Sequence, residues 1–263
     1  MSSAMMKMLQ KRKQKDRPKS ASTVFSANDR GKILNDNTPF AIRETYNSVR
    51  AKLMFLARGE KCPVYVVTSA NACEGKTTNA INFAVSFAQL GKKTLLIDAD
   101  MRNPTINRYF GIKRENGLSE LLAGIDEGDP ICPSPIENLD FLPSGEIPPN
   151  PADLLMSPRM ASLLDVLRKN YDYIFLDTPP VVMVADATVV AAKVTGYILV
   201  VQSEVTDVRD VQYATEAIRQ LDGNVVGFFL NETRQGSGRY YNRYNYYSSQ
   251  RYSYVYQQKD HDN

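Results

Sequence analysis

The sequence contains almost no histidine. Its 263 residues include a single histidine, His261, which stands close to the end, and no tryptophan. Histidine is the side chain that proteins use most often as a general base near neutral pH and as a metal ligand. We therefore do not expect nucleophilic catalysis based on histidine, or a metal site built from histidines, in the core of this chain.

Cysteines and long apolar runs are also scarce. The three cysteines, Cys62, Cys73 and Cys132, form no CxxC pair, so the sequence predicts neither a disulfide framework nor a zinc site. This suits a reducing cytosol. No segment reaches the ~20 consecutive apolar residues of a membrane-spanning helix. The basic N-terminus has no apolar segment behind it, so we do not expect a signal peptide.

The positive charge is concentrated near the N-terminus. The formal net charge is only +3, yet residues 7–19 carry seven lysines or arginines against one acid, Asp16. Such a run is usually a solvated, disordered arm. The alternative is an arm that contacts an anionic membrane surface, where each basic residue adds roughly 1 kcal/mol. We predict three parts: a basic disordered arm over residues 1–37, a folded domain over 38–232 and a disordered tail over 233–263.

The middle of the chain alternates between apolar strands and helices. Because the strands are almost continuously apolar, the pattern predicts an α/β fold whose mostly parallel sheet is covered by helices on both faces. We expect strands over residues 64–68, 94–98, 139–142, 173–177, 196–201 and 225–230. We expect helices over residues 41–56, 77–90, 117–122, 152–169 with a break near Ser157 and Pro158, 185–193 and 208–221.

A phosphate-binding loop is predicted between the first strand and the helix after it. The loop reads Ala-Asn-Ala-Cys-Glu-Gly-Lys-Thr over residues 70–77. In such a loop backbone N–H groups bind phosphates, the lysine contacts the β and γ phosphates, and the threonine hydroxyl binds Mg²⁺. The cofactors predicted are thus ATP and Mg²⁺. The nucleotide-binding residues predicted are Ala72, Cys73, Glu74, Gly75, Lys76, Thr77 and Thr78.

The loop departs from the usual pattern at two positions, and a chance match is the alternative interpretation. Ala70 stands where the first glycine is usual. Cys73 stands where glycine or another small residue is usual, and its Cβ can narrow the loop or change its backbone angles.

Three aspartates follow two of the later strands. Asp98 and Asp100 end one strand with a spacing that puts both on the same side, and Asp177 ends another. We assign Mg²⁺ to Thr77, Asp98 and, through water, Asp177. The alternatives are ordinary surface carboxylates at a strand end and, for Asp177, a turn or capping role.

These motifs together resemble those of the bacterial tyrosine kinases. Gly75-Lys-Thr, Asp98-Ala-Asp-Met-Arg102 and Asp177-Thr-Pro-Pro resemble their three Walker-type motifs. Residues 143–155 and the tyrosine-rich tail also resemble family segments. The resemblance covers roughly Phe40 to the end. It is greatest to the cytoplasmic kinase of capsular or exopolysaccharide biosynthesis that Gram-positive bacteria make as a separate chain.

The resemblance implies a P-loop ATPase core related to MinD and ParA and transfer of the ATP γ-phosphate to tyrosine. Lys76 would neutralise the transferring phosphate and Asp100 would serve as base or orienting group. Arg102 would stabilise phosphate charge, or equally form a salt bridge that stabilises the fold. The implied phosphorylation sites are Tyr240, Tyr241, Tyr244, Tyr246, Tyr247, Tyr252, Tyr254 and Tyr256, although the tail could also be only a solubilising or sticky segment.

The implied partners are a transmembrane chain-length-determinant activator, which would recruit the cytoplasmic chain to the inner face of the plasma membrane, and a cognate tyrosine phosphatase. No nucleic-acid partner is implied. The family forms rings through a Glu-x-x-Arg-x-x-Arg helix. Here the matching residues are Glu44, Asn47 and Arg50, so Asn47 departs from the motif.

Two rival functions remain at this point. One is a nucleotide switch of the MinD or ParA type. Those proteins carry a signature lysine early in the loop, where this chain has Asn71, and a tyrosine-rich tail is not the amphipathic helix expected of them. The other is a scaffold that binds ATP without turning it over.

Overall fold

The computed structural model describes residues 32–57, 59–111, 116–125 and 128–232. Most of the predicted basic arm and the whole predicted tail, with its eight tyrosines, lie outside the described residues. No helix among the described residues is long and apolar enough to cross a membrane.

The described residues build a mostly parallel sheet, as predicted, and it has seven strands where six were expected. The strands lie in the order β3-β4-β2-β5-β1-β6-β7, and the pairing is parallel except between β3 and β4. The strands are β1 (Val64–Ser69), β2 (Thr94–Asp98), β3 (Cys132–Pro133), β4 (Leu139–Leu142), β5 (Tyr173–Asp177), β6 (Gly196–Gln202) and β7 (Val225–Asn231).

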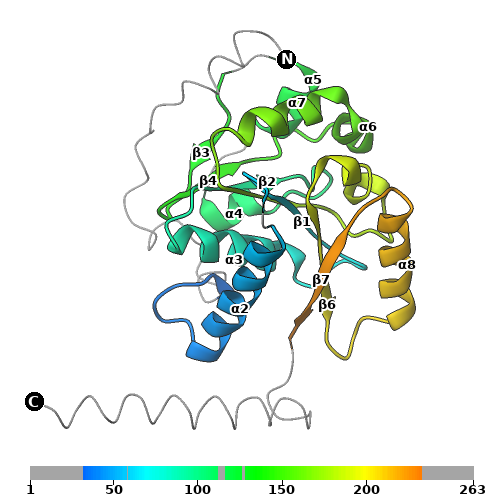
Figure 1. Cartoon of the computed structure of the whole chain (residues 1–263). Coiled ribbons are helices and arrows are strands. Elements are labelled where there is room, and N and C mark those ends of the chain that lie inside the picture. Colours follow the sequence, from blue (N-terminus) through cyan, green and yellow to red (C-terminus); the bar gives the residue numbers. More distant parts are fainter. Residues whose placement is uncertain (1–31, 58, 112–115, 126–127, 233–263) are drawn as a thin grey trace, which may run out of the picture. The chain divides into compact units, whose positions relative to one another are not determined.

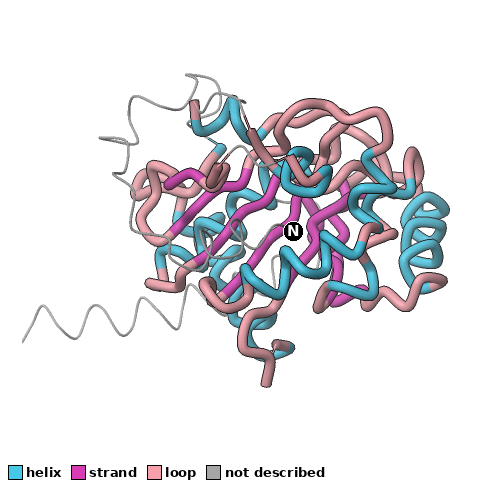
Figure 2. Tube along the Cα trace, turned by 90° about the horizontal axis from the view of Figure 1, so that it is seen from above, coloured by secondary structure: helices cyan, strands magenta, loops and turns pink. Residues whose placement is uncertain are grey.

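Helices cover both faces of this sheet (Figures 1 and 2). One face carries α2 (Phe40–Leu56), α3 (Lys76–Gln89) and α4 (Ile106–Phe110), whose apolar side chains form one core cluster. The other face, with the second cluster, carries α5 (Leu118–Ala123), α6 (Pro151–Met156), α7 (Pro158–Leu167), the short 3₁₀ helices η3 (Ala185–Ala187) and η4 (Ala191–Lys193), and α8 (Val208–Arg219).

Helix α3 lies under the centre of the sheet, and every residue from Asn79 to Ala88 is buried. Its Phe83 and Phe87 pack on Phe175 of β5, with ring centroids 6.4 and 5.3 Å apart. Buried aromatic side chains remove large apolar areas from water. The helix that follows the phosphate-binding loop is therefore fixed to the sheet along most of its length.

Three regions differ from the sequence prediction. The helix expected over residues 185–193 is instead the two short 3₁₀ helices. A β-branched run, Thr188-Val189-Val190, lies between them, and such side chains lose rotamer freedom in an α-helix. The short elements α4 and β3 were not predicted. The break expected near Ser157 is confirmed, because α6 ends at Met156 and α7 begins at Pro158.

The packed chain also begins earlier than predicted. Ile33 and Leu34, which fall within the predicted disordered arm, are buried in the core beside α2 and α3. The side chain of Asn82 fixes this segment. It accepts a hydrogen bond from Leu34 N at 2.9 Å and donates one to the Lys32 carbonyl at 2.8 Å. The predicted boundary at residue 37 is therefore too late.

The strand register brings the predicted motifs together. Asp98 of β2 lies opposite Asp177 of β5, and Val67 of β1 also pairs with Asp177. The carboxyl ends of β2, β5 and β1 thus meet at one edge of the sheet. Ligands of open parallel α/β sheets bind at this edge.

Candidate nucleotide-binding site

The loop between β1 and α3 has the backbone of a phosphate-binding loop. Gly75 caps the N-terminus of α3 with a φ of 88°, and Cys73 also has a positive φ, 64°. Ala72 and Cys73 are exposed and Glu74 is buried. The four residues after it, Gly75 to Thr78, are half-buried. A left-handed residue next to a helix N-terminus gathers backbone N–H groups on one side, which suits an anion.

The side chain of Lys76 reaches across the site to two of the strand-end carboxylates. Its Nζ atom lies 2.7 Å from Asp100 Oδ2 and 3.9 Å from Asp177 Oδ1. Burial lowers the pKa of Lys76, but the carboxylates of Asp177 and Asp100 outweigh this, so the pKa is raised. The lysine is therefore charged, and its ammonium group lies among the strand-end carboxylates.

Asp98 and Asp177 each have one carboxylate oxygen without a hydrogen-bond partner. The Thr77 hydroxyl donates to Asp177 Oδ2 at 2.7 Å, and Ile106 N donates to Asp98 Oδ2 at 3.2 Å. Asp98 Oδ1 and Asp177 Oδ1 are buried and have no hydrogen-bond partner, although Lys76 Nζ lies 3.9 Å from Asp177 Oδ1. Burial, followed by repulsion from Asp177, raises the pKa of Asp98. Burial also raises the pKa of Asp177.

These features fit a divalent cation. Two buried carboxylate oxygens without donors, beside a threonine hydroxyl, are the oxygen ligands that Mg²⁺ prefers. Among the described residues no three His, Cys, Asp or Glu side chains gather as a metal site. This is compatible with Mg²⁺, which is commonly held by one or two carboxylates together with phosphate oxygens and water.

Side chains from distant segments also bind the loop, and the motifs in the sequence do not predict these contacts. Asn71 Nδ2 donates to Asp210 Oδ2 of α8 at 2.8 Å. The Thr206 hydroxyl donates to Glu74 Oε1 at 2.6 Å, and Asn231 Nδ2 donates to the Glu74 carbonyl at 3.0 Å. A polar residue at the carboxyl end of a predicted parallel strand could have drawn attention to Asn231. No sequence pattern marks the other contacts.

The hydrogen bonds of Arg102 go to Asp186 and not to the other predicted site residues. Its Nε and Nη2 atoms donate to the two oxygens of Asp186, both at 2.9 Å, and Asp186 is fully buried. Of the two roles considered for Arg102, this geometry is that of a fold-stabilising ion pair between the end of β2 and η3.

The three predicted assembly residues lie on α2. Glu44 is exposed, and its Oε1 accepts a hydrogen bond from Asn47 Nδ2 at 2.7 Å. Arg50 instead contacts its own chain, because its Nη1 donates to the Ser86 carbonyl of α3 at 2.6 Å. The structure thus leaves Glu44 and Asn47 at the surface and turns Arg50 toward α3.

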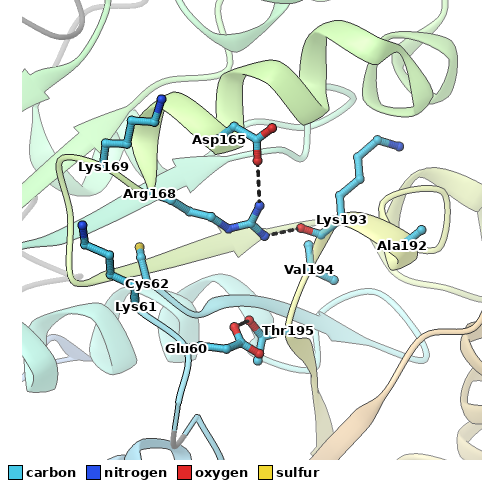
Figure 3. A pocket seen from close by; sticks show the side chains of 10 residues that line it. All are labelled: Glu60, Lys61, Cys62, Asp165, Arg168, Lys169, Ala192, Lys193, Val194 and Thr195. Carbon is cyan, nitrogen blue, oxygen red and sulfur yellow. Dashed lines mark hydrogen bonds and ion pairs between the residues drawn. The ribbon is translucent and has the colours of Figure 1, made fainter.

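A hollow of about 860 Å³ lies away from this site, at the edge of the sheet where β1, β5 and β6 begin (Figure 3). Across it, Arg168 donates to Asp165 and to the Lys193 carbonyl. The residues that line it precede these strands, whereas the loop and the aspartates follow the strand ends. The hollow is therefore not the nucleotide site.

The site is that of a P-loop nucleoside triphosphatase, because a phosphate-binding loop joins a strand to a helix and aspartates end two neighbouring strands. Residues 65–227 match the family described as an AAA domain. Within this class the chain belongs to the bacterial tyrosine kinases. It is 40% identical over 191 residues to the tyrosine-protein kinase CpsD of Streptococcus pneumoniae serotype 4, covering 72% of this chain and 83% of CpsD. It is 37% identical over 207 residues to YwqD of Bacillus subtilis, covering 78% and 86%.

Solved structures agree with this. The kinase domain of the Escherichia coli tyrosine kinase ETK superposes with a TM-score of 0.73 at 32% identity, covering 80% of this chain and 84% of that one. The cell division ATPase MinD of Pyrococcus furiosus, at 22% identity and a TM-score of 0.55 over 67% of this chain and 74% of that one, shares the fold. The protein is a tyrosine kinase that uses ATP.

The first prediction concerns Arg102. Arg102→Ala leaves the buried Asp186 carboxylate without this donor, and because Arg102 is itself partly exposed we expect the free energy of unfolding to fall by about 1–3 kcal/mol. ATP affinity, measured well below the melting temperature, should change little. Arg102→Lys keeps the charge but loses the paired geometry, so its free energy of unfolding should lie between those of the wild type and Arg102→Ala. Denaturant unfolding measures the first effect. A variant as stable as the wild type but unable to transfer phosphate would instead make Arg102 catalytic.

The second prediction concerns Cys73. Its left-handed backbone costs a non-glycine residue about 1–2 kcal/mol, and its side chain is exposed. Cys73→Gly should therefore keep or raise the rate of ATP turnover. Cys73→Ser, which keeps the Cβ and loses the thiol, is the matched control and should behave like the wild type. A severe loss in the glycine variant alone would show that the loop needs a side chain there.

Proposed function

We propose that this kinase phosphorylates its own C-terminal tyrosine cluster in an Mg²⁺-dependent reaction and thereby regulates capsular or exopolysaccharide synthesis. The observation that carries the proposal is the set of Lys76, Thr77, Asp98, Asp100 and Asp177 at the carboxyl ends of three adjacent strands. Phosphoryl transfer requires positioning and neutralisation of charge, and this set supplies both.

Each side chain has a distinct role in the proposal. Thr77, Asp98 and, through water, Asp177 would hold Mg²⁺, which would supply positive charge to the phosphates. Lys76 leaves Asp100 and binds the γ-phosphate. The carboxylate of Asp100, released from the lysine, then accepts the proton of the tyrosine hydroxyl, whose usual pKa is near 10. The tyrosine oxygen bonds to the γ-phosphorus, and the bond from that phosphorus to ADP breaks. No histidine is needed for this chemistry.

We further infer that a membrane protein of the chain-length-determinant type activates the kinase and brings it to the inner face of the plasma membrane. Exposed apolar side chains support a partner at the site. Met183 lies in the loop after β5, and Val205 and Val208 follow β6. These strands flank β1, which leads into the phosphate-binding loop. A similar solved structure, 37% identical with a TM-score of 0.71 over 76% of this chain and 88% of that one, is of the chimerical protein CapA2B2.

Assembly into a ring and removal of phosphate by a cognate tyrosine phosphatase complete the proposed cycle. Ring formation would place one subunit's tail beside the site of its neighbour. The exposed Glu44 and the partly exposed Asn47 on α2 are available for such contacts, whereas the contact of Arg50 with Ser86 supports a role inside its own subunit.

The third prediction tests the kinase site and its substrate together. Lys76→Met removes the γ-phosphate contact, so tail phosphotyrosine formed by the purified protein with ATP and Mg²⁺ should fall below detection by mass spectrometry. A variant with all eight tail tyrosines changed to phenylalanine is the control, and it should bind ATP normally. Undiminished tail phosphotyrosine in the Lys76→Met protein would refute the assignment.

The fourth prediction separates Asp98 from Asp100. Asp98→Asn should weaken Mg²⁺-dependent ATP binding at least about 10- to 100-fold, since that is the usual loss when even a residue that only supports a metal ligand is removed. Asp100→Asn should leave binding nearly unchanged and slow transfer at least about 100-fold, as expected for a lost general base. ATP titration with and without Mg²⁺ and single-turnover kinetics measure the two effects. Equal, small effects of both substitutions on binding and on transfer would show that the two aspartates are only charged residues at the end of a strand.

A further inference from the structure

Two amide side chains hold adjacent carbonyl groups of the phosphate-binding loop. Asn231 Nδ2, at the end of β7, donates to the Glu74 carbonyl at 3.0 Å. Asn79 Nδ2, on α3, donates to the Gly75 carbonyl at 2.9 Å. The C=O and N–H groups of a planar trans peptide point in opposite directions. The Gly75 carbonyl also accepts the helical hydrogen bond from Asn79 N at 3.0 Å. The N–H groups of Gly75 and Lys76 therefore point away from the two amides, and the amides help to keep them in that orientation.

The Asn79 amide is itself held by helix α2. The hydroxyl of Tyr46 donates to Asn79 Oδ1 at 2.6 Å, and the bond is buried. Burial raises the pKa of Tyr46 to about 12, so the hydroxyl stays protonated and available as a donor. Because an amide that accepts at Oδ1 is fixed in its orientation, this bond turns the NH₂ group of Asn79 toward the loop.

Packing leaves Tyr46 little freedom. Its ring stacks on Phe229 of β7 with centroids 5.5 Å apart, and it meets the edge of Phe83 of α3 at 5.6 Å. Asn82 Nδ2 also donates to the Tyr46 hydroxyl at 3.2 Å, and the same amide binds the Lys32 carbonyl. A shift of α2 against α3, which lie side by side (Figure 1), would therefore move the Tyr46 hydroxyl and with it the Asn79 amide.

We propose that Tyr46 and Asn79 are positioning residues that connect α2 to the phosphate-binding loop, so that the position of α2 sets the affinity for ATP. Because such coupling is reciprocal, ATP in turn restrains α2. The proposal rests on the proposed nucleotide site but not on tyrosine transfer. Since α2 also carries Glu44 and Asn47 at its surface, anything that binds this helix would act on the nucleotide through the Tyr46 hydroxyl.

The fifth prediction uses Tyr46→Phe, which keeps the ring stacking and removes only the hydroxyl. Loss of one hydrogen bond to the amide should weaken ATP binding about three- to tenfold. Tyr197→Phe is the matched control. It removes another buried hydroxyl, which donates to the Ala187 carbonyl at 2.8 Å on the opposite face of the sheet. It should lower stability comparably and leave ATP affinity unchanged. ATP titration at a temperature where all variants are folded gives the comparison.

Two further measurements distinguish positioning from general destabilisation. In a double-mutant cycle, Tyr46→Phe should add little to the loss caused by Asn79→Ala, because both act through one amide. In wild-type protein, saturating ATP should slow amide hydrogen exchange in α2, and Tyr46→Phe should diminish that protection. Equal ATP affinities for Tyr46→Phe and Tyr197→Phe, additive losses, or α2 exchange indifferent to ATP would each overturn the proposal. Wild-type protein that bound no ATP would refute the nucleotide site itself.

Discussion

The ammonium group of Lys76 compensates three carboxylates that the sheet forces together. Parallel register places Asp98 beside Asp177, and Asp100 follows on the same strand end, so their proximity is a consequence of topology. Two like charges 4 Å apart repel by about 4 kcal/mol at an effective dielectric constant of 20. The positive charge of the lysine therefore offsets the repulsion among the carboxylates. A substrate that binds the lysine in place of the carboxylates must bring positive charge of its own to offset that repulsion. A nucleotide that arrives with a divalent cation meets this condition.

Much of the fold and site could be predicted because the signals are local. Each motif consists of residues within one loop or at one strand end, and the parallel sheet implied by the apolar strands brings those ends to a single edge. Thus the neighbourhood of Lys76, Asp98 and Asp177 followed from pattern and topology. The contacts of Asp186, Thr206 and Asp210 did not, because each joins segments dozens of residues apart. Such pairs depend on the geometry of loops, which the spacing of apolar residues along the sequence does not predict.

Short elements also escaped prediction, for related reasons. Ile33 and Leu34 form an apolar pair in a polar stretch, too short to show a period, and their burial depends on the side chain of Asn82. The expected helix over residues 185–193 contained enough apolar residues to look helical. There the β-branched run and the turn of Asp186 toward Arg102 decided the local structure.

The phosphate-binding loop is held by Asp210, Thr206, Asn231 and Asn79, which come from α8, the segment before it, β7 and α3. The consequence is entropic. Ordering a flexible backbone costs about 1–2 kcal/mol per residue, and here folding rather than ligand binding carries that cost. Phosphate binding then retains more of its interaction energy as affinity. Because none of these four contacts involves the side chain of Cys73, the loop can keep its shape while the residue at that position varies.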